Sequence, residues 1–427
     1  MSLSELEQQV CGVIAGRRAA LLADLRLHVE LPTGGGNADA LDKSRGLLTA
    51  RAAALGARVE LVAGQGRPEW LFGSPGYGGR ESGQSPPHPL PPPPTAVCRR
   101  EAGIDGAPLL IAGHLDTVHD PGGPFQRLEV SADGSRGVGP GCADMKGGLV
   151  ITLGALECLE ACGVRLPWTL LLNSDEETGS YHSQQAILDE AARVAALGGV
   201  GIAVEPGANG SDGALVVERA GSGQFFVEVR GRAAHVGRDF GSGVSAVKSL
   251  AGLILRISEL SNPAEGLIVN IGPIEGGHAT NAVPERARAW GNARFPDETG
   301  ARALETRLRE VVAAANGGGI SARVEVSMVR AAKPQTPGTM ELAEVARAAS
   351  LDLGRVLPFA KTAGVCDGNI MQGAGLPTLD TLGVRGGGLH TTDEWIEIGS
   401  LVDRCSLLAV FMMRAAGSRS PGLGSQS

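Results

Sequence analysis

Three apolar segments of the chain run directly into side chains that can bind a metal ion. The residues concerned are Asp175, Glu176 and Glu177 after segment 168–172, His114 and Asp116 after segment 109–113, and Glu205 after segment 200–204. Carboxylates this close together repel one another, and burying them at a strand end is costly unless a cation is present. In an open α/β sheet, ligands bind at the carboxyl ends of the strands. The pattern therefore predicts a metal site at one edge of a sheet, and with it a metallohydrolase.

His114 and Asp116 are two residues apart at the end of an expected strand, so their side chains point to the same side. This spacing lets His114 bind a metal ion while Asp116 hydrogen-bonds the imidazole from behind and raises its basicity. A histidine on an apolar strand is more often an ordinary core residue. The pair alone therefore leaves both interpretations open.

Two further candidate ligands lie in glycine-rich segments. Asp144 lies within residues 139–148, Gly-Pro-Gly-Cys-Ala-Asp-Met-Lys-Gly-Gly, at the expected start of a helix. Alone, it could be a simple N-cap. His390 follows three glycines within residues 386–394, near the end of the chain.

Taken together, these motifs resemble those of the co-catalytic zinc peptidase family that includes aminoacylase, acetylornithine deacetylase, succinyl-diaminopimelate desuccinylase and the folate-cleaving glutamate carboxypeptidases. The resemblance is nearest to the glutamate carboxypeptidase type. It extends over residues 20–415 apart from a proline-rich segment, and five separate motifs occur in the order found in the family.

The resemblance implies a site that holds two zinc ions per subunit. His114 and Glu205 would hold one ion, Glu177 and His390 the other, and Asp144 would bridge both. Two such ions about 3.5–4 Å apart can share a hydroxide and polarise a carbonyl oxygen. Because all the ligands are nitrogen and oxygen donors, Co²⁺ or Mn²⁺ would also fit.

The resemblance also implies catalytic roles. Glu176 would be the general base that takes a proton from the bridging water and returns it to the leaving amine. Asp116 would orient His114. In the family the peptide bond after the bridging acid is cis, which makes the bond between Asp144 and Met145 a candidate.

Further matches lie outside the strand ends. His235, within residues 229–237, resembles the family's lid histidine, which reaches a neighbouring subunit's site and hydrogen-bonds the oxyanion of the tetrahedral intermediate. The implied substrate contacts are Asn281 in a lid turn, Arg294 at a strand end, Lys333 before a proline and Gly364 in a glycine-rich segment. Where this chain has Lys333, the glutamate carboxypeptidases have an arginine. Because lysine is a point charge, the difference weakens the expectation of strict glutamate specificity.

The implied function is an amidohydrolase that cleaves an amide or peptide bond adjacent to a free carboxylate through a metal-bridging hydroxide. A carboxypeptidase or N-acyl-amino-acid deacylase is favoured, because relatives with glutamate at the position of Glu205 tend to have these activities. The alternatives are a dipeptidase or aminopeptidase of the same family and, in a different class, a non-catalytic binding protein on this fold. The implied partners are a small N-acyl amino acid or short peptide, and a second copy of the chain.

These residues require strands and helices to position them. Strand and helix patterns alternate and predict an α/β fold with a doubly wound mixed sheet, including helices at 4–30, 39–55 and 146–162 and a strand at 58–63. Between residues 223 and 328 the order becomes β-α-β-β-α-β, the ferredoxin-like arrangement. A small α+β domain, residues 219–331, is therefore expected within a discontinuous zinc catalytic domain, residues 1–218 and 332–427. The family implies that this insert is a lid and dimerisation domain. Residues 73–94, rich in Gly and Pro, predict a surface loop.

Length and composition bear on the number of domains, the kind of partner and the cellular compartment. A length of 427 residues predicts two domains, and a net charge of −8, from 38 basic and 46 acidic residues, argues against a nucleic-acid partner. The seven irregularly spaced cysteines indicate reduced thiols in a cytosolic protein. The chain begins without a signal-peptide pattern and has no apolar run of 18 residues, so we expect a cytoplasmic protein without a membrane partner.

Overall fold

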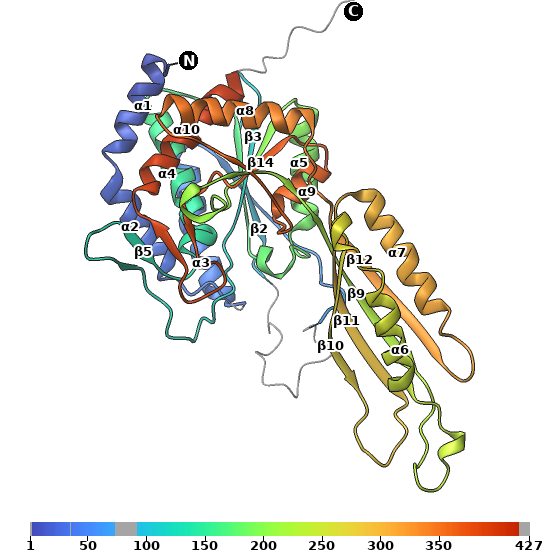
Figure 1. Cartoon of the computed structure of the whole chain (residues 1–427). Helices are drawn as coiled ribbons and strands as arrows, with labels where there is room; N and C mark the ends of the chain where they lie inside the picture. The colour runs from blue at the N-terminus through green and yellow to red at the C-terminus, as the bar shows by residue number, and fades with distance from the viewer. Residues whose placement is uncertain (1, 35, 73–91, 418–427) are drawn as a thin grey trace, which may run out of the picture.

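The computed structural model describes residues 2–34, 36–72 and 92–417 of the chain. These residues form a main unit around a central sheet and a second unit, residues 221–330, built on a sheet of its own (Figure 1). Most of the predicted Gly- and Pro-rich loop, residues 73–91, lies outside the described residues.

The main unit is built on a six-stranded mixed sheet. In spatial order its strands are β1 (Arg58–Val62), β2 (Thr95–Arg100), β6 (Trp168–Asn173), β3 (Leu109–His114), β7 (Val200–Ala203) and β14 (Thr378–Asp380). The four strands from β6 to β14 are parallel, whereas β2 is antiparallel to β6 and β1 is antiparallel to β2. Every residue of β3, β6 and β7 is buried, as expected for parallel strands covered on both faces.

Helices cover both faces of this sheet (Figure 1). One face carries α1 (Glu5–Ala15), α2 (Arg18–Val29), α3 (Ala38–Ala54), α4 (Gly147–Ala161), α8 (Pro337–Asp352) and α10 (Ser400–Gly417), and the other carries α5 (Gln184–Ala196) and α9 (Asp367–Gly373). Leu109 and Ile111 of β3 pack into the core on the side of α4 and α10, whereas Leu110 and Ala112 pack on the side of α5 and α9. This division follows from the alternation of side chains along a strand.

The predicted single helix at residues 4–30 was wrong, because the structure has two helices there. Helix α1 ends at Ala15 with Gly16 as its C-cap, and α2 begins at Arg18. Glycine costs about 1 kcal/mol relative to alanine inside a helix, which favours a helix end at this position. The predicted helices at 39–55 and 146–162 correspond to α3 and α4, with ends shifted by one residue.

The second unit has the element order predicted for it. Its elements are β9 (Gly221–Arg230), α6 (Ala246–Ser258), β10 (Ile268–Gly276), β11 (Arg286–Phe295), α7 (Glu298–Ala313) and β12 (Ser321–Arg330). The four strands form an antiparallel sheet in the order β10-β11-β9-β12, and both helices pack on one face of it. In Figure 1 this unit extends away from the main unit as a long arm.

Two small sheets complete the described residues. A parallel pair contains β8 (Leu215–Arg219) and β13 (Phe359–Thr362), and a four-stranded sheet contains, in spatial order, β15 (Gly386–Gly387), β16 (Trp395–Glu397), β5 (Arg136–Val138) and β4 (Glu129–Val130). Single turns of helix are η1 (Cys142–Lys146), η2 (Glu176–Thr178), η3 (Gly210–Asp212), η4 (Phe240–Ser242) and η5 (Pro263–Glu265).

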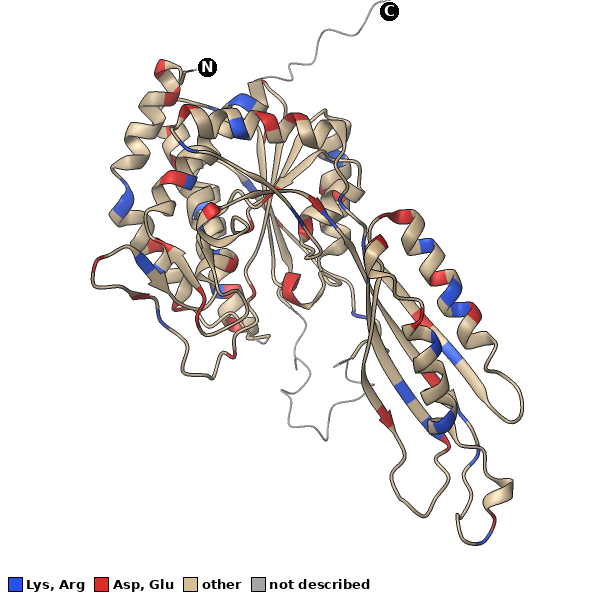
Figure 2. Ribbon diagram, viewed as in Figure 1, with Lys and Arg blue, Asp and Glu red and all other residues tan. Residues whose placement is uncertain are grey.

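The distribution of charge and cysteine agrees with the composition. Basic and acidic residues are interspersed along both units (Figure 2). All seven cysteines lie within the described residues, and none forms a disulfide. Among the helices described, none combines the length and the apolar character that crossing a membrane requires.

Candidate metal centre

The candidate site lies where three neighbouring parallel strands end. Strand β3 lies between β6 and β7, and its last residue, His114, is opposite Asn173 at the end of β6. Glu176 and Glu177 follow β6 in the single turn η2, and Glu205 follows β7. Because parallel strands place their carboxyl ends at one sheet edge, segments far apart in sequence deliver their ligands to one place.

Asp144 lies between the two predicted histidine ligands. Its Oδ1 is 3.1 Å from Nε2 of His114, and its Oδ2 is 3.6 Å from Nε2 of His390. Nε2 of His390 is also 3.4 Å from Oε2 of Glu177. His114, Asp144 and Glu177 each offer a ligand atom within 4.8 Å of the others. Each oxygen of Asp144 thus faces a different histidine.

A buried carboxylate, that of Glu394, holds the turn that presents Asp144. It accepts hydrogen bonds from the main-chain N–H groups of Gly141, Ala143 and Asp144, at 2.9, 2.8 and 3.0 Å. His119 contacts this carboxylate through Nε2 at 2.7 Å. The imidazole of His119 is therefore paired with Glu394 and is not one of the candidate metal ligands. Sequence reasoning missed the role of Glu394, although the residue ends the His390 motif.

The peptide bond between Asp144 and Met145 is cis, as the resemblance implied.

Asp116 contacts both sides of the site. Nδ1 of His114 lies 2.9 Å from the main-chain oxygen of Asp116 and 3.5 Å from its Oδ1. The carboxylate of Asp116 accepts hydrogen bonds from the N–H groups of Glu176 at 3.2 Å and Glu177 at 2.9 Å. The main chain of Asp116 thus makes the shorter contact to the imidazole, while its side chain positions the two glutamates.

The carboxylates of the site are crowded and largely buried. Burial raises the pKa of Glu176 to about 8, although Arg330 lies beside it. Burial and the charge of Asp144 raise the pKa of Glu205 well above its ordinary value. Burial would also raise the pKa of Asp144, but hydrogen bonds from His114 and His390 hold this pKa well below its usual range. A divalent cation would stabilise such a cluster, and its imidazole and carboxylate donors fit zinc or a similar ion.

Four of the five predicted ligands line a cavity of about 500 Å³ that the two units share, whereas the buried His114 is not among the residues that line it. The main unit contributes Asp144, Glu176, Glu177, Glu205, Gly364 and His390, among others, and the second unit contributes Ser222, Gln224, Asn292, Arg294 and Arg330. Predicted ligands, the predicted base and two of the predicted substrate contacts, Arg294 and Gly364, therefore surround one space.

Arg330 is a cavity residue that sequence reasoning missed. Its Nη1 lies 2.8 Å from Oε1 of Glu176, and its Nη2 donates to the main-chain oxygen of Glu176 at 2.8 Å. Simple alternation along β12 would place Arg330 with Met328, on the face toward the helices. A register shift between Ser327 and Arg330 turns it to the opposite face, where it lies across from Ser222. Only the strand pairing reveals that shift.

The predicted substrate contact Lys333 is not among the residues that line this cavity. Lys333 is fully buried, with its Nζ 3.3 Å from Oδ2 of Asp380. The position of a lysine before a proline does not indicate which way its side chain points, and here the side chain turns to Asp380.

His235 and Asn281 lie outside the cavity. They come together beyond the ends of β9 and β10, where the N–H of Val236 donates to the main-chain oxygen of Asn281 at 3.0 Å. His235 is exposed, and its Nδ1 accepts from the N–H of Gly237 at 3.1 Å. Within one chain, the structure does not bring these two residues to the candidate metal centre.

The sequence is similar to those of known hydrolases. Residues 110–414 match the family model described as peptidase family M20/M25/M40. Carboxypeptidase G2 from Pseudomonas sp. (strain RS-16) is 29% identical over 315 residues, which cover 73% of this chain and 74% of that protein. A succinyl-diaminopimelate desuccinylase from Methylobacterium radiotolerans is 26% identical over 318 residues, covering 70% of this chain and 79% of the relative.

A solved structure shares the overall fold. The crystal structure of a tripeptidase from Staphylococcus aureus superposes with a TM-score of 0.70 at 22% identity, covering 93% of this chain and 98% of that one. At this identity the likeness is evidence for the fold alone.

Proposed function

The chain belongs to peptidase family M20/M25/M40 and is a metal-dependent hydrolase, and we propose that it cleaves an amide or peptide bond adjacent to a free carboxylate. Within that class, we propose a carboxypeptidase or an N-acyl-amino-acid deacylase. Relatives named as a carboxypeptidase and a desuccinylase support this choice.

One observation carries the proposal: Arg294 faces the cavity with an unused donor. Its Nη1 is buried and has no hydrogen-bond partner within the described part of the chain. Arg294 and Arg330 both lie opposite Ser222, on the strands at either side of β9. Burial and the charge of Arg330 lower the pKa of Arg294. A substrate carboxylate would supply the missing partner, since arginine binds carboxylates through two parallel N–H groups.

We propose that the site holds two divalent cations, zinc in the first instance. His114 and Glu205 would hold one, Glu177 and His390 the other, and Asp144 would be a ligand of both. When bound, the cations would supply Lewis-acid activation of a water molecule and of the scissile carbonyl. The position of Asp144 between the two histidines supports this assignment.

The chain's own residues would provide proton transfer. Glu176 is buried in the cavity next to the proposed ligand Glu177, and Arg330 restrains its side chain. We propose that Glu176 accepts the proton of the attacking water and delivers it to the leaving amine. Asp116 would hold Glu176 and Glu177 in place through their N–H groups.

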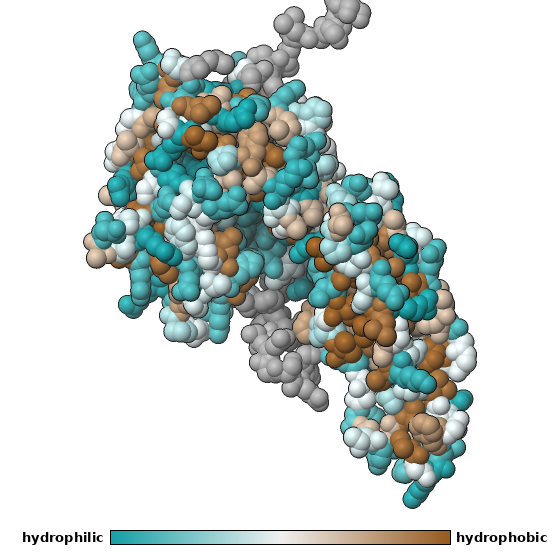
Figure 3. All heavy atoms as spheres, in the orientation of Figure 1, coloured by the Kyte–Doolittle hydropathy of each residue, from teal (hydrophilic) through white to brown (hydrophobic). Residues whose placement is uncertain are grey.

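We further propose that the second unit pairs with that of another copy of the chain. Hydrophobic side chains gather on this unit over α6 and the strands beside it (Figure 3). The exposed apolar residues there include Val247 and Leu255 of α6 and Ile274 of the edge strand β10. Pairing through this surface would cover them, and His235 and Asn281 would then act in the partner's site.

The test is a screen of N-acyl amino acids and dipeptides with free or amidated C-termini. We expect hydrolysis of the free acids only, and a loss of about 10–100-fold in kcat/KM for Arg294→Gln, the loss of a charged hydrogen bond. Arg286→Gln is the matched control, because Arg286 lies on the same strand but pairs with Glu228. Equal cleavage of amidated substrates would instead support an aminopeptidase. Cleavage of dipeptides without cleavage of N-acyl amino acids would support a dipeptidase.

A further inference from the structure

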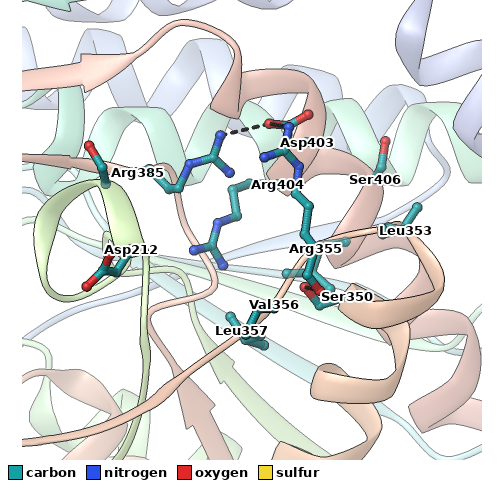
Figure 4. Close-up of a pocket in the computed structure, with 13 residues that line it drawn as sticks. Asp212, Ser350, Leu353, Arg355, Val356, Leu357, Arg385, Asp403, Arg404 and Ser406 are labelled. Carbon is teal, nitrogen blue, oxygen red and sulfur yellow. Dashed lines mark hydrogen bonds and ion pairs between the residues drawn. The ribbon is translucent and has the colours of Figure 1, made fainter.

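A second cavity, of about 340 Å³, lies in the main unit apart from the candidate metal centre. Its walls come from the C-terminal end of α8 and the loop after it, from α10, and from the segments that hold Asp212 and Arg385 (Figure 4). Ligand-binding cavities in proteins begin at about 300 Å³, so a small molecule fits here.

Three arginines line this cavity, against two aspartates. Nε of Arg385 donates to Glu397 at 2.8 Å, and its Nη2 donates to Asp403 at 2.8 Å. Nη2 of Arg355 lies 2.6 Å from the same oxygen of Asp403. The carboxylates of Glu397 and Asp403 are therefore already bound by Arg385 and Arg355.

The third arginine, Arg404, is only 3% exposed and has two unused donors. Its Nη2 donates to the main-chain oxygen of Gly213, but its Nε and Nη1 are buried without a hydrogen-bond partner in the described residues. Figure 4 shows the guanidinium in the middle of the cavity, between Asp212 and the chain at Val356 and Leu357. Leaving charged donors buried and unbonded is costly, so a ligand that accepts from both would be bound favourably.

We propose that this cavity binds a small oxyanion, a phosphate or carboxylate group, with Arg404 as its principal contact. The Nε and Nη1 donors of one guanidinium match two oxygens of such a group, which arginine recognises by its planar fork. Arg355, half-exposed and paired with Asp403, places a second guanidinium at the same cavity. Burial and the nearby Arg385 lower the pKa of Arg404 to about 10, which leaves it charged at neutral pH.

The test is isothermal titration calorimetry of the full-length, metal-loaded protein with inorganic phosphate and, separately, with acetate, at an ionic strength held constant with chloride. We expect saturable binding of at least one of the two. Stronger binding of phosphate assigns the site to phosphoryl groups, and equal or stronger binding of acetate assigns it to carboxylates. Binding of neither overturns the proposal.

Variants locate the binding. Arg404→Gln should weaken it at least tenfold, and Arg355→Gln should weaken it by a smaller factor. Arg165→Gln, which removes an exposed arginine elsewhere on the main unit, should bind as the wild type does. Circular dichroism checks that each variant is folded. If Arg404→Gln does not fold, Arg355→Gln decides. Unchanged binding in a folded Arg404→Gln variant would show that the anion binds outside this cavity and would overturn the proposal. Where Arg355→Gln is the deciding variant, unchanged binding there has the same meaning.

Discussion

Glu176 and Glu177 are adjacent in the chain, yet their side chains have different neighbours. The carboxylate of Glu177 lies 3.4 Å from His390, in the group that can hold a metal ion. The carboxylate of Glu176 instead lies 2.8 Å from a guanidinium nitrogen of Arg330. The turn η2, held by Asp116, separates the two side chains. This difference distinguishes a proposed base from a proposed ligand.

The corresponding prediction compares the substitutions Glu176→Gln and Glu177→Gln. Glu176→Gln should retain the metal content of the wild type and lose about 10²–10⁴-fold in kcat, because only the proton acceptor is removed. Glu177→Gln should lower the metal content. Elemental analysis and steady-state kinetics measure both quantities. If Glu176→Gln empties the site while Glu177→Gln leaves it filled, the two roles are reversed.

His28 of α2 should make the stability of the main unit depend on pH. It is 3% exposed, and burial together with the charges of Arg51 and Lys146 lowers its pKa to about 4. Between pH 6.5 and 4, His28 is therefore protonated in the unfolded chain but stays neutral in the folded chain. The contribution of His28 to the free energy of unfolding is fully present above pH 6.5. It falls by up to about 3 kcal/mol as the pH drops from 6.5 to 4.

Replacing His28 by glutamine removes this titration. Urea unfolding at pH 7.5 and 4.5 should show a smaller loss of stability for His28→Gln than for the wild type. The comparison between the two proteins cancels the titration of other groups. The same loss in both proteins would show that His28 does not contribute.

At the scale of elements, helix α4 packs unusually closely against the end of β7. A Cβ atom on Gly148, in the first turn of α4, would lie 2.0 Å from the main-chain oxygen of Val204. Val204 immediately precedes the proposed ligand Glu205. The missing side chain at Gly148 thus lets the helix that follows Asp144 approach the strand end that carries Glu205.

Gly148→Ala should therefore be destabilising, although alanine is the better helix former. We expect an unfolding temperature several degrees lower than that of the wild type and a reduced metal content, because the strand end must move. The matched control is Gly46→Ala in α3 of the main unit, where a Cβ meets nothing within 4 Å. That variant should be unchanged or more stable by up to about 1 kcal/mol. Equal effects of the two substitutions, measured by calorimetry, would refute the close approach.

At the scale of the whole molecule, the two chain segments that connect the units run side by side. Arg219 and Lys333 exchange two main-chain hydrogen bonds of 2.9 Å. Both side chains also pair with Asp380 of β14, Arg219 Nη2 at 2.9 Å and Lys333 Nζ at 3.3 Å. The second unit is thereby fastened to the central sheet next to the cavity that both units line. This anchoring is the structural role of Lys333.

The proposed dimer predicts complementation between inactive chains. His235→Ala and Glu176→Gln should each be inactive alone, since one lacks the histidine of the second unit and the other the base. A mixed dimer would contain one site with an intact Glu176 and a His235 from the partner. Activity should therefore return on mixing under conditions that allow subunit exchange. Two dimeric variants that fail to complement would show that His235 does not act in a neighbouring site.

Local patterns in the sequence determined much of this protein. The apolar segments that lead to His114, Glu176 and Glu205 are buried parallel strands, because residues covered on both faces must be apolar along their whole length. The element order of the second unit followed from the change in periodicity. The family followed from five motifs, which survive as short stretches of chain whatever their neighbours in space.

Tertiary structure decided what depends on contacts between distant segments. Arg330 faces the cavity only because a register shift in β12 turns it over, and Lys333 is buried because it pairs with Asp380. Glu394 serves the Asp144 turn across 250 residues of chain. The unused donors of Arg404 become visible only when the walls of its cavity are assembled. None of these features leaves a pattern in the neighbouring sequence, because each arises only when separate elements pack together.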